Sequence, residues 1–303
     1  MNEDSLVKLL ASSGLGKEVT ASYDLSQLST YKVGGRAKLF TRISKSICLE
    51  KISKFITESG MKVLIVGNGS NLLISDLGFD GLVIQLGEDF QNMSTAGQLV
   101  TAGGATNLPI LSRYTVKNGL SGLEWAVGVP GTVGGAVRMN AGGHGASISD
   151  SISSASIFDL QENHYKKLNA KDLKMKYRST TISNYEIVVE AEFLLNSGKV
   201  EKGDERISEI VKWRRENQPG GQNAGSVFMN PLGDSAGRLI DAAGLKGYEV
   251  GSAMVSEKHA NFIQVKPNGS ADDVYKLMKV VHSRVLEETG VFLETETIMV
   301  GFD

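Results

Sequence analysis

Two glycine-rich loops carry the clearest chemical signal in the sequence. They read Val66-Gly67-Asn68-Gly69-Ser70-Asn71 and Gly128-Val129-Pro130-Gly131-Thr132-Val133-Gly134-Gly135-Ala136. Glycine lets backbone N–H groups approach an anion without interference from a Cβ atom, and successive N–H groups can form a concave site for a diphosphate. Two such loops in one part of the chain favour a large phosphate-bearing ligand.

Neither loop matches a standard nucleotide-binding fingerprint. The first lacks the third glycine of GxGxxG and leads into an apolar stretch rather than a clear helix. The run Gly14-Leu15-Gly16-Lys17-Glu18 has neither the spacing nor the Ser/Thr of a P-loop. Because one glycine loop alone is more often a turn than a ligand site, the prediction depends on the two loops occurring together.

The reactive side chains exclude several other kinds of chemistry. Cys48 is the only cysteine, so we expect neither an internal disulfide nor a cysteine-rich metal site. The histidines, His144, His164, His259 and His282, lack an HExxH-like spacing, so we predict no metal. With 32 Lys and Arg against 34 Asp and Glu, the net charge of -2 argues against a nucleic-acid partner.

Length and composition bound the class of protein. A chain of 303 residues is long enough for about two domains, and 41% hydrophobic with 22% charged residues is typical of a globular protein. No apolar run approaches the ~20 residues of a membrane helix, and the acidic N-terminus is unlike a secretion signal. We expect a cytoplasmic protein without a membrane partner. The sequence does not determine the oligomeric state, and a monomer is compatible with it.

The spacing of apolar residues predicts the elements that carry the loops. Helices are expected over residues 46–59, before Gly60, and 107–118, with Pro109 in the first turn. The residues before 20 are interpreted as a short, weakly packed lead. Strands are expected over residues 62–66, 72–75, 82–86, 98–102 and 187–195, the last half-buried, and over 30–40 with a corner at the double glycine.

A change in composition near residues 196–203 predicts a domain boundary. It separates residues 1–197, with a core from about 30, from residues 204–303. Ser270 and Asp273 form the pattern of a capping box at the start of a long helix. The C-terminal elements are expected to be helices over 204–217, 236–243 and 271–289 and a strand over 296–300.

Eight short motifs, in order along almost the whole chain, resemble the UDP-N-acetylenolpyruvoylglucosamine reductase (MurB) family. Each motif alone is weak, but their order and spacing make the similarity strong. They are TYKVGGRA (30–37), VGNGSNLLISDLGFDGLVI (66–84), GLEWAVGVPGTVGGAVRMNAGGHG (122–145), YRST (177–180), GSVFMNP (225–231), AGRLIDAAGLKG (236–247), SEKHANFI (256–263) and GVFLETE (290–296).

The resemblance implies an α+β fold and a flavin cofactor. The N-terminal part would be an FAD-binding module of the vanillyl-alcohol-oxidase (PCMH) type, followed by a C-terminal α+β substrate domain. The short segment between Arg178 and Ser226 resembles the branch without an extra tyrosine loop. We expect non-covalent FAD, against which His144 is the one candidate for a covalent link. The residues expected to bind FAD are Gly67, Asn68, Gly69, Ser70, Asn71, Gly128, Gly131, Thr132, Gly134 and Gly135.

The family reaction implied by this resemblance reduces the enolpyruvyl ether of UDP-N-acetylglucosamine to UDP-N-acetylmuramate with NADPH, for peptidoglycan synthesis. By position in the motifs, Arg178 would stabilise the enolate, because a guanidinium is planar, bidentate and always charged. Ser226 would donate the proton, and Glu296, chosen over Glu294 by the motif alone, would assist the enolate or orient Arg178. Taken alone, these residues are a surface arginine, a turn serine and a solvated acid.

The same resemblance implies contacts with the UDP-sugar substrate. Tyr177 and Asn230 would contact it, and Arg214 and Arg215 would meet its diphosphate or form a solvated helix face. His259 is expected to be structural rather than catalytic. Departures from the family pattern are Met229 in place of a basic residue, and Thr295 and Thr297 around the glutamate.

Two alternatives to the reductase stay open from the sequence. An FAD-dependent sugar or alcohol oxidase would use the same FAD module, with oxygen as electron acceptor. A catalytically silent nucleotide-binding protein is the third candidate, and Met229 is the feature that hints at it. Flavin content and the substrate that accepts electrons discriminate among the three.

Overall fold

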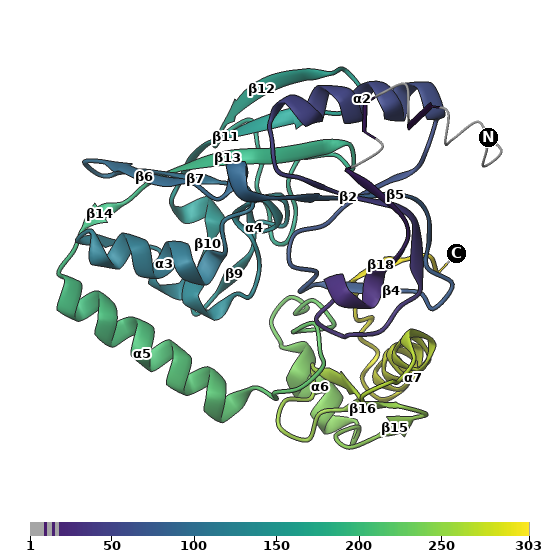
Figure 1. Cartoon of the computed structure of the whole chain (residues 1–303). Helices are drawn as coiled ribbons and strands as arrows, with labels where there is room; N and C mark the ends of the chain where they lie inside the picture. Colours follow the sequence, from purple (N-terminus) through teal and green to yellow (C-terminus); the bar gives the residue numbers. More distant parts are fainter. Residues whose placement is uncertain (1–8, 11–13, 16–17, 303) are drawn as a thin grey trace. The chain divides into compact units, whose positions relative to one another are not determined.

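The computed structural model describes residues 9–10, 14–15 and 18–302 and divides the chain into two compact units (Figure 1). Each unit is assembled from three separate segments. Unit 1 contains Met1–Ala21, Leu39–Gly67 and Gly81–Lys212, and unit 2 contains Ser22–Lys38, Asn68–Asp80 and Trp213–Asp303. The interpretation of a single boundary near residues 196–203 does not anticipate this interleaving, in which two early segments belong with the C-terminal residues.

A five-stranded antiparallel sheet of order β12-β11-β13-β7-β6 forms one part of unit 1. Its strand β13 is buried on both faces near its start, because Val188 packs into one hydrophobic cluster while Ile187 and Val189 pack into another. The half-buried strand expected from the alternation is therefore covered on both sides. The strands are β6 Met93–Ala96, β7 Leu99–Gly103, β11 Ile152–Asp159, β12 His164–Asn169 and β13 Glu186–Leu194.

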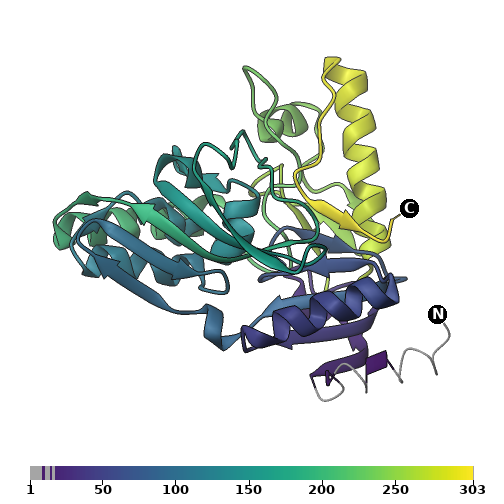
Figure 2. The same ribbon diagram turned by 90° about the horizontal axis from the view of Figure 1, so that it is seen from above.

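A second sheet has the order β1-β2-β5-β3, and most of it lies in unit 1. Helix α2 (Ile47–Ser59) packs against this sheet (Figure 2). The helix ends at Gly60, which has a φ of 64°, as the sequence predicts. Leu15 is fully buried in the same hydrophobic cluster, so this residue of the expected lead is well packed. The strands are β1 Val19–Asp24, β2 Arg36–Ile43, β3 Val63–Ile65 and β5 Phe79–Leu86.

Short elements between these sheets carry the second glycine loop. Helix α3 (Leu108–Lys117) has the expected proline in its first turn, and α4 (Val133–Arg138) follows the loop. Helix α5 (Val200–Asn217) begins in unit 1 and ends in unit 2. The others are η2 Glu88–Phe90, η3 Glu124–Gly128, η4 Ile148–Asp150, β8 Leu120–Ser121, β9 Gly142–Gly143, β10 Ala146–Ser147 and β14 Asn196–Ser197.

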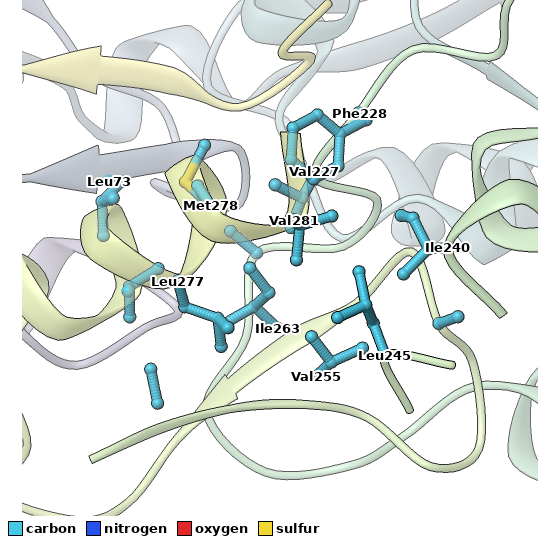
Figure 3. Packing of buried hydrophobic residues seen from close by; sticks show 14 of the residues in the cluster. Leu73, Val227, Phe228, Ile240, Leu245, Val255, Ile263, Leu277, Met278 and Val281 are labelled. Atoms are coloured by element: carbon cyan, nitrogen blue, oxygen red, sulfur yellow. The ribbon is translucent and has the colours of Figure 1, made fainter. Parts of the chain in front are cut away.

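Unit 2 is built around helix α7 (Ala271–Thr289), whose bounds match the prediction. Figure 3 shows its Leu277, Met278 and Val281 packed with Leu73 from an early segment of the chain. That segment forms β4 (Leu72–Ile74), which pairs in parallel with β18 (Ile298–Val300). The other elements are η1 Leu25–Leu28, α6 Ala236–Ala242, and a sheet of β15 Glu249–Val250, β16 Ala253–Val255 and β17 Ile263–Val265.

The N-terminus of α7 is capped by side chains from two places. Ser270 accepts hydrogen bonds from the N–H groups of Asp272 (3.1 Å) and Asp273 (3.3 Å), as expected of the N-cap. The Asp273 carboxylate binds Ser252 instead of the backbone at the cap, at 2.8 and 2.7 Å. Asp76 adds three further hydrogen bonds to this terminus, so the cap is not a simple capping box.

The strand expected over residues 30–40 begins only at Arg36. Gly34 has a φ of 117°, and a Cβ there would lie 2.8 Å from the carbonyl oxygen of Ile74. The backbone therefore turns sharply against β4 before the strand starts. The residues before this turn contribute instead to the core of unit 2, where Tyr31 and Val33 are buried.

Candidate active site

The first glycine loop, residues 67–71, leads from β3 to β4 and keeps several backbone donors available. No described residue accepts a hydrogen bond from the N–H groups of Gly69, Ser70 or Asn71. The carbonyl of Gly69 accepts from both the backbone and the hydroxyl of Thr30, at 3.2 and 3.4 Å. Gly69 has a φ of 60°, and a Cβ there would collide with a carbonyl of η1. Only glycine fits, and the open N–H groups suit an anion.

A relay of side chains within unit 1 holds the start of this loop. The Gln85 amide donates to the carbonyl of Gly67 at 2.7 Å, and its Oε1 accepts from Arg42 at 3.0 and 2.8 Å. Because C=O and N–H of a trans peptide point in opposite directions, this bond fixes the direction of the N–H of Asn68. A Cβ at Gly67 would collide with Oγ1 of Thr132, so the two glycine loops touch here.

The second glycine loop uses most of its helix-starting donors within the protein. Thr132 caps α4, and its Oγ1 accepts from the N–H of Gly135 at 3.3 Å. The N–H groups of Val133 and Gly134 donate at 2.8 Å to carbonyls of the loop that follows β7. The carbonyl of Gly131 accepts from the first residue of α3 at 2.9 Å. The start of α4 therefore does not offer these donors to a phosphate, unlike the first loop.

Arg178 lies in a tight turn whose backbone conformation is unusual. Lys176 and Ser179 exchange backbone hydrogen bonds of 2.9 and 3.1 Å, which closes the turn. Arg178 has a φ of 54°, in the left-handed region that a non-glycine residue adopts at a cost of about 1–2 kcal/mol. One Nη atom donates to the carbonyl of Gly142 at 3.2 Å, and the guanidinium lies 5.0 Å from the ring centre of Tyr177. Such outliers gather at functional sites.

The structure brings Ser226 and Glu296 together within unit 2. The carbonyl of Val227, the residue after Ser226, accepts from the N–H of Glu296 at 2.8 Å. The Asn71 side chain donates to the Glu296 carbonyl at 2.9 Å, which ties this segment to the first glycine loop of the same unit. Both Ser226 and Glu296 are half-buried, whereas Glu294 is exposed. The backbone thus places a hydroxyl and a carboxyl group on neighbouring segments.

A buried amide braces the Ser226 segment from its other edge. Asn261, only 3% exposed, accepts from the N–H of Phe228 at 2.9 Å and donates to its carbonyl at 2.8 Å. Its own carbonyl accepts from the N–H of Val227 at 2.9 Å. The side chain of Asn261 therefore completes the hydrogen bonding that a neighbouring strand would otherwise supply.

The residues expected to contact the substrate have local structural partners. The Asn230 side-chain oxygen accepts from the first N–H of α6 at 3.1 Å. Arg214 is half-buried at the end of α5, burial lowers its pKa, and its Nε donates to Gln218 at 2.7 Å. Arg215 is exposed, and its carbonyl accepts from Lys258 at 2.5 Å. Tyr177 is 54% exposed.

His144 and His259 both have structural roles, at different places in the fold. His144 and Gly145 form the turn between β9 and β10, with φ values of 53° and 84°. Burial lowers the pKa of His259, whose Nδ1 accepts from the N–H of Asn261 at 3.2 Å. This contact makes His259 part of the support for the Ser226 segment. Within the described ranges, no cluster of His, Cys, Asp or Glu side chains suits a metal ion.

Several residues of the site were missed from the sequence. Asn261 and Asn140 lie inside the quoted motifs, where nothing distinguishes them from their neighbours before the fold is known. Gln85 and Arg138 carry no signal, because their partners lie far from them along the chain. Met229 donates its N–H to the carbonyl of Glu294 at 2.8 Å, so its backbone holds the segment whatever its side chain does.

Two features of the glycine loops, each within one unit, suit a dinucleotide cofactor. In unit 2 the first loop offers the N–H donors of residues 69–71 for a diphosphate. In unit 1 the start of that loop, Gly67, lies against Thr132 of the second loop. Two buried polar atoms near the second loop have no partner among the described residues, Oγ1 of Thr106 and Nε1 of Trp125. Buried donors without a partner are costly, so such atoms suit a bound ligand or an ordered water. Gly128, the last residue of η3, follows this tryptophan.

Two family models match consecutive parts of the chain. Residues 44–163 match an FAD binding domain, and residues 217–300 match the C-terminal domain of UDP-N-acetylenolpyruvoylglucosamine reductase. The expected order of an FAD-binding α+β module and a C-terminal domain of this family is therefore confirmed. None of the described helices is both long and apolar enough to cross a membrane.

Relatives resemble the chain over nearly its whole length. The UDP-N-acetylenolpyruvoylglucosamine reductase of Heliobacterium modesticaldum is 39% identical over 280 residues, covering 91% of this chain and 89% of the relative. A Bacillus cereus enzyme of that name is 37% identical, with 98% and 99% covered. The crystal structure of the Thermus caldophilus enzyme has a TM-score of 0.80 at 34% identity, covering 93% of this chain and 98% of that one.

Proposed function

The chain belongs to the UDP-N-acetylenolpyruvoylglucosamine reductase family, and from this premise we propose that it reduces UDP-N-acetylglucosamine enolpyruvate to UDP-N-acetylmuramate with NADPH. The observation that carries the proposal is the 39% identity that extends over 91% of the chain. The product is a precursor of peptidoglycan, and we place the reaction in the cytoplasm. The segment between the arginine turn and Ser226 fits the shorter branch of the family.

FAD is the cofactor that this assignment implies, and we propose that it binds without a covalent link. When bound, it supplies hydride transfer between NADPH and the alkene of the substrate. The open N–H groups of Gly69, Ser70 and Asn71 would hold its diphosphate. The second loop would adjoin the cofactor through Gly128, Gly131, Thr132, Gly134 and Gly135, and Gly67 and Asn68 would complete the first.

Arg178 would stabilise the negative charge that develops on the substrate. When a hydride reaches the outer alkene carbon, the electron pair of the double bond moves toward the carboxylate and forms an enolate. A guanidinium binds two oxygens of such a group at once and keeps its charge at all working pH values. The strained turn and the stacking on Tyr177 restrict where this group points.

Ser226 would deliver the proton that completes the reduction. Its Oγ–H bond breaks as a C–H bond forms at the carbon next to the carboxylate, and solvent then restores the hydroxyl proton. Glu296 on the neighbouring segment would assist the enolate in its protonated form or orient Arg178. The backbone bond between Val227 and Glu296 supports a shared role for the hydroxyl and the carboxyl group.

The UDP part of the substrate would meet polar groups of unit 2. Arginine forks suit phosphates, and Arg214 and Arg215 carry them at the end of α5. The Asn230 oxygen is used at α6, so its NH₂ group would be the one to contact the substrate. Tyr177, which belongs to unit 1, would contact the substrate with its exposed ring.

The visible spectrum of the purified protein tests the proposal. A yellow protein whose flavin is bleached by NADPH, and recovers its colour on adding UDP-N-acetylglucosamine enolpyruvate without oxygen, is expected. Acid precipitation should release the flavin into the supernatant. A flavin that simple sugars bleach and oxygen restores, and whose colour the enolpyruvyl nucleotide does not restore, would contradict the assignment, as would a protein unable to bind FAD.

Two variants test the residue roles. In Ser226→Ala, flavin reduction by NADPH should persist at the wild-type rate while reduction of the substrate falls by about 10²-fold or more, the upper range for proton transfer by a positioned group. In Glu294→Gln the same step should be unchanged, because we assign the role to Glu296. Equal substrate reduction in Ser226→Ala and wild type would contradict the role of the serine.

A further inference from the structure

Arg138, the last residue of α4, grips the segment that follows Arg178. Its Nη1 donates to the carbonyl of Ser183 at 2.7 Å, and its Nη2 donates to Oδ1 of Asn184 at 2.5 Å. Its own carbonyl accepts from Oγ1 of Thr180 at 2.7 Å. One residue thus contacts the chain at three points within six residues of the arginine turn.

The residues after Arg138 grip the other side of the same turn. The side chain of Asn140, which is 6% exposed, donates to the carbonyl of Lys176 at 2.9 Å. The carbonyl of Gly142 accepts from the guanidinium of Arg178 at 3.2 Å. The short stretch from Arg138 to β9 therefore contacts the turn on both sides, from Lys176 to the loop 183–184.

The turn needs these contacts because its backbone is strained. A left-handed conformation at Arg178 costs about 1–2 kcal/mol and persists only where surrounding contacts over-determine it. Among the described residues, the turn is closed by two backbone hydrogen bonds of its own, between Lys176 and Ser179. Loss of the hydrogen bonds from Arg138 or Asn140 would let the loop relax and the guanidinium of Arg178 move.

The environment of Arg138 favours a fork of hydrogen bonds over a free charge. Burial lowers the pKa of its guanidinium, while the nearby Glu186 opposes that shift. Glu186 accepts from the N–H of Ser183 at 2.5 Å and pairs with Lys166, so the loop has a rigid base beneath it. The two acceptors of Arg138 lie on successive residues, a geometry that a planar guanidinium satisfies and an ammonium does not.

We propose that Arg138 is a positioning residue, which holds the turn of Arg178 so that its guanidinium meets the carboxylate of the substrate. The inference rests on the proposed role of Arg178 and adds to it a residue that does not itself touch the substrate. Its chemistry is a bidentate hydrogen bond to the loop 183–184 and not a second positive charge on the substrate.

Two substitutions separate these roles in the flavin-loaded protein. Arg138→Lys keeps the charge and loses the fork, and we expect reoxidation of the reduced flavin by UDP-N-acetylglucosamine enolpyruvate to slow by about 10- to 100-fold, the scale of a small misplacement. Flavin reduction by NADPH should stay at the wild-type rate. Arg206→Lys, an exposed arginine paired with Glu209 on α5, is the matched control and should change neither step.

A double-mutant cycle with Arg178→Ala decides whether Arg138 acts through Arg178. Arg178→Ala alone should slow substrate-dependent reoxidation by about 10²- to 10³-fold, and adding Arg138→Lys should slow it no further. Multiplying effects, or an unchanged rate in Arg138→Lys alone, would overturn the positioning inference and leave the role of Arg178 intact. An unchanged rate in Arg178→Ala would overturn both.

A milder variant covers the case in which Arg138→Lys fails to fold. Asn184→Ala removes one of the two acceptors at an exposed position, and we expect a smaller slowing, about threefold or more, with the same Tm and flavin content as wild type. The affinity for the product, measured by calorimetry, should fall in parallel, because the same guanidinium holds the carboxylate of the product. A wild-type rate and affinity in folded Asn184→Ala would contradict the inference.

Discussion

Replacing Asn261 should destabilise unit 2 far more than an ordinary amide substitution. Its side chain is 3% exposed and satisfies both the N–H and the carbonyl of Phe228, which is itself 2% exposed. A buried backbone group left without a partner costs about 1–3 kcal/mol. Two such groups give about 4 kcal/mol for Asn261→Ala, before any entry of water into the space left by the side chain.

The stability of the Asn261→Asp variant should depend on pH for the same reason. The introduced carboxyl group can replace the amide only when protonated, because a carboxylate cannot donate to the Phe228 carbonyl. Burial and this hydrogen bond both raise its folded pKa above the ~3.9 of an unfolded aspartate. Stability supplied by the protonated form is therefore present at low pH and lost as pH rises through the folded pKa. We expect the variant to approach wild type below about pH 4, the unfolded pKa, and to lose stability progressively from pH 5 toward pH 8.

Urea unfolding followed by circular dichroism at several pH values measures both effects. The matched control is Asn217→Ala, an exposed amide that bonds the Trp213 carbonyl at 2.8 Å and should cost less than about 0.5 kcal/mol. A loss below about 1 kcal/mol in Asn261→Ala would refute the reasoning. So would an Asn261→Asp variant whose deficit relative to wild type is the same at pH 5 and pH 8.

Three further predictions test other contacts. Gln85→Ala frees the Gly67 carbonyl, so the Kd for FAD measured by flavin fluorescence in the apoprotein should rise about 5- to 10-fold, about 1 kcal/mol for one hydrogen bond; an unchanged Kd would contradict the relay. Burial raises the pKa of Glu186, but the hydrogen bonds from Lys166 and Ser183 and the charge of Lys166 together lower it below its usual value. Wild-type stability should therefore fall as pH drops below 4.5, and Lys166→Met, itself costing about 2 kcal/mol, should flatten that fall in a urea titration. Asp76→Ala should lower stability by about 1–2 kcal/mol through the N-terminus of α7, and an unchanged urea midpoint would count against that cap.

Local patterns in the sequence predicted the helices well. Helix α7 has the predicted bounds because a serine cap, an apolar stripe and Gly290 all agree. Helix α2 ends at the predicted glycine for the same reason. The prediction that a strand starts at residue 30 was wrong, because the close approach of Gly34 to Ile74 is a long-range contact that no local pattern contains.

The candidate site was predictable only in part. Glycine spacing indicated an anion-binding loop, and the open donors at residues 69–71 support it. The same signal at residues 133–135 was ambiguous, because only the fold reveals that nearby carbonyls and Thr132 use those donors. Roles for Arg178, Ser226 and Glu296 came from resemblance. Spacing alone cannot pair Ser226 with Glu296, because the two are about 70 positions apart and the backbone bond that brings their segments together joins Val227 to Glu296.

The parallel pairing of β4 with β18 has a consequence for synthesis on the ribosome. β4 is translated early, yet its partner Ile298–Val300 follows long after it in the chain. Until those residues leave the exit tunnel, Leu73 and Tyr31 have no completed core to enter, although they are among the most buried residues of the finished chain. The early apolar segment therefore lacks its packing partners until β18 has been made, and this interval is the time when a chaperone would be most useful.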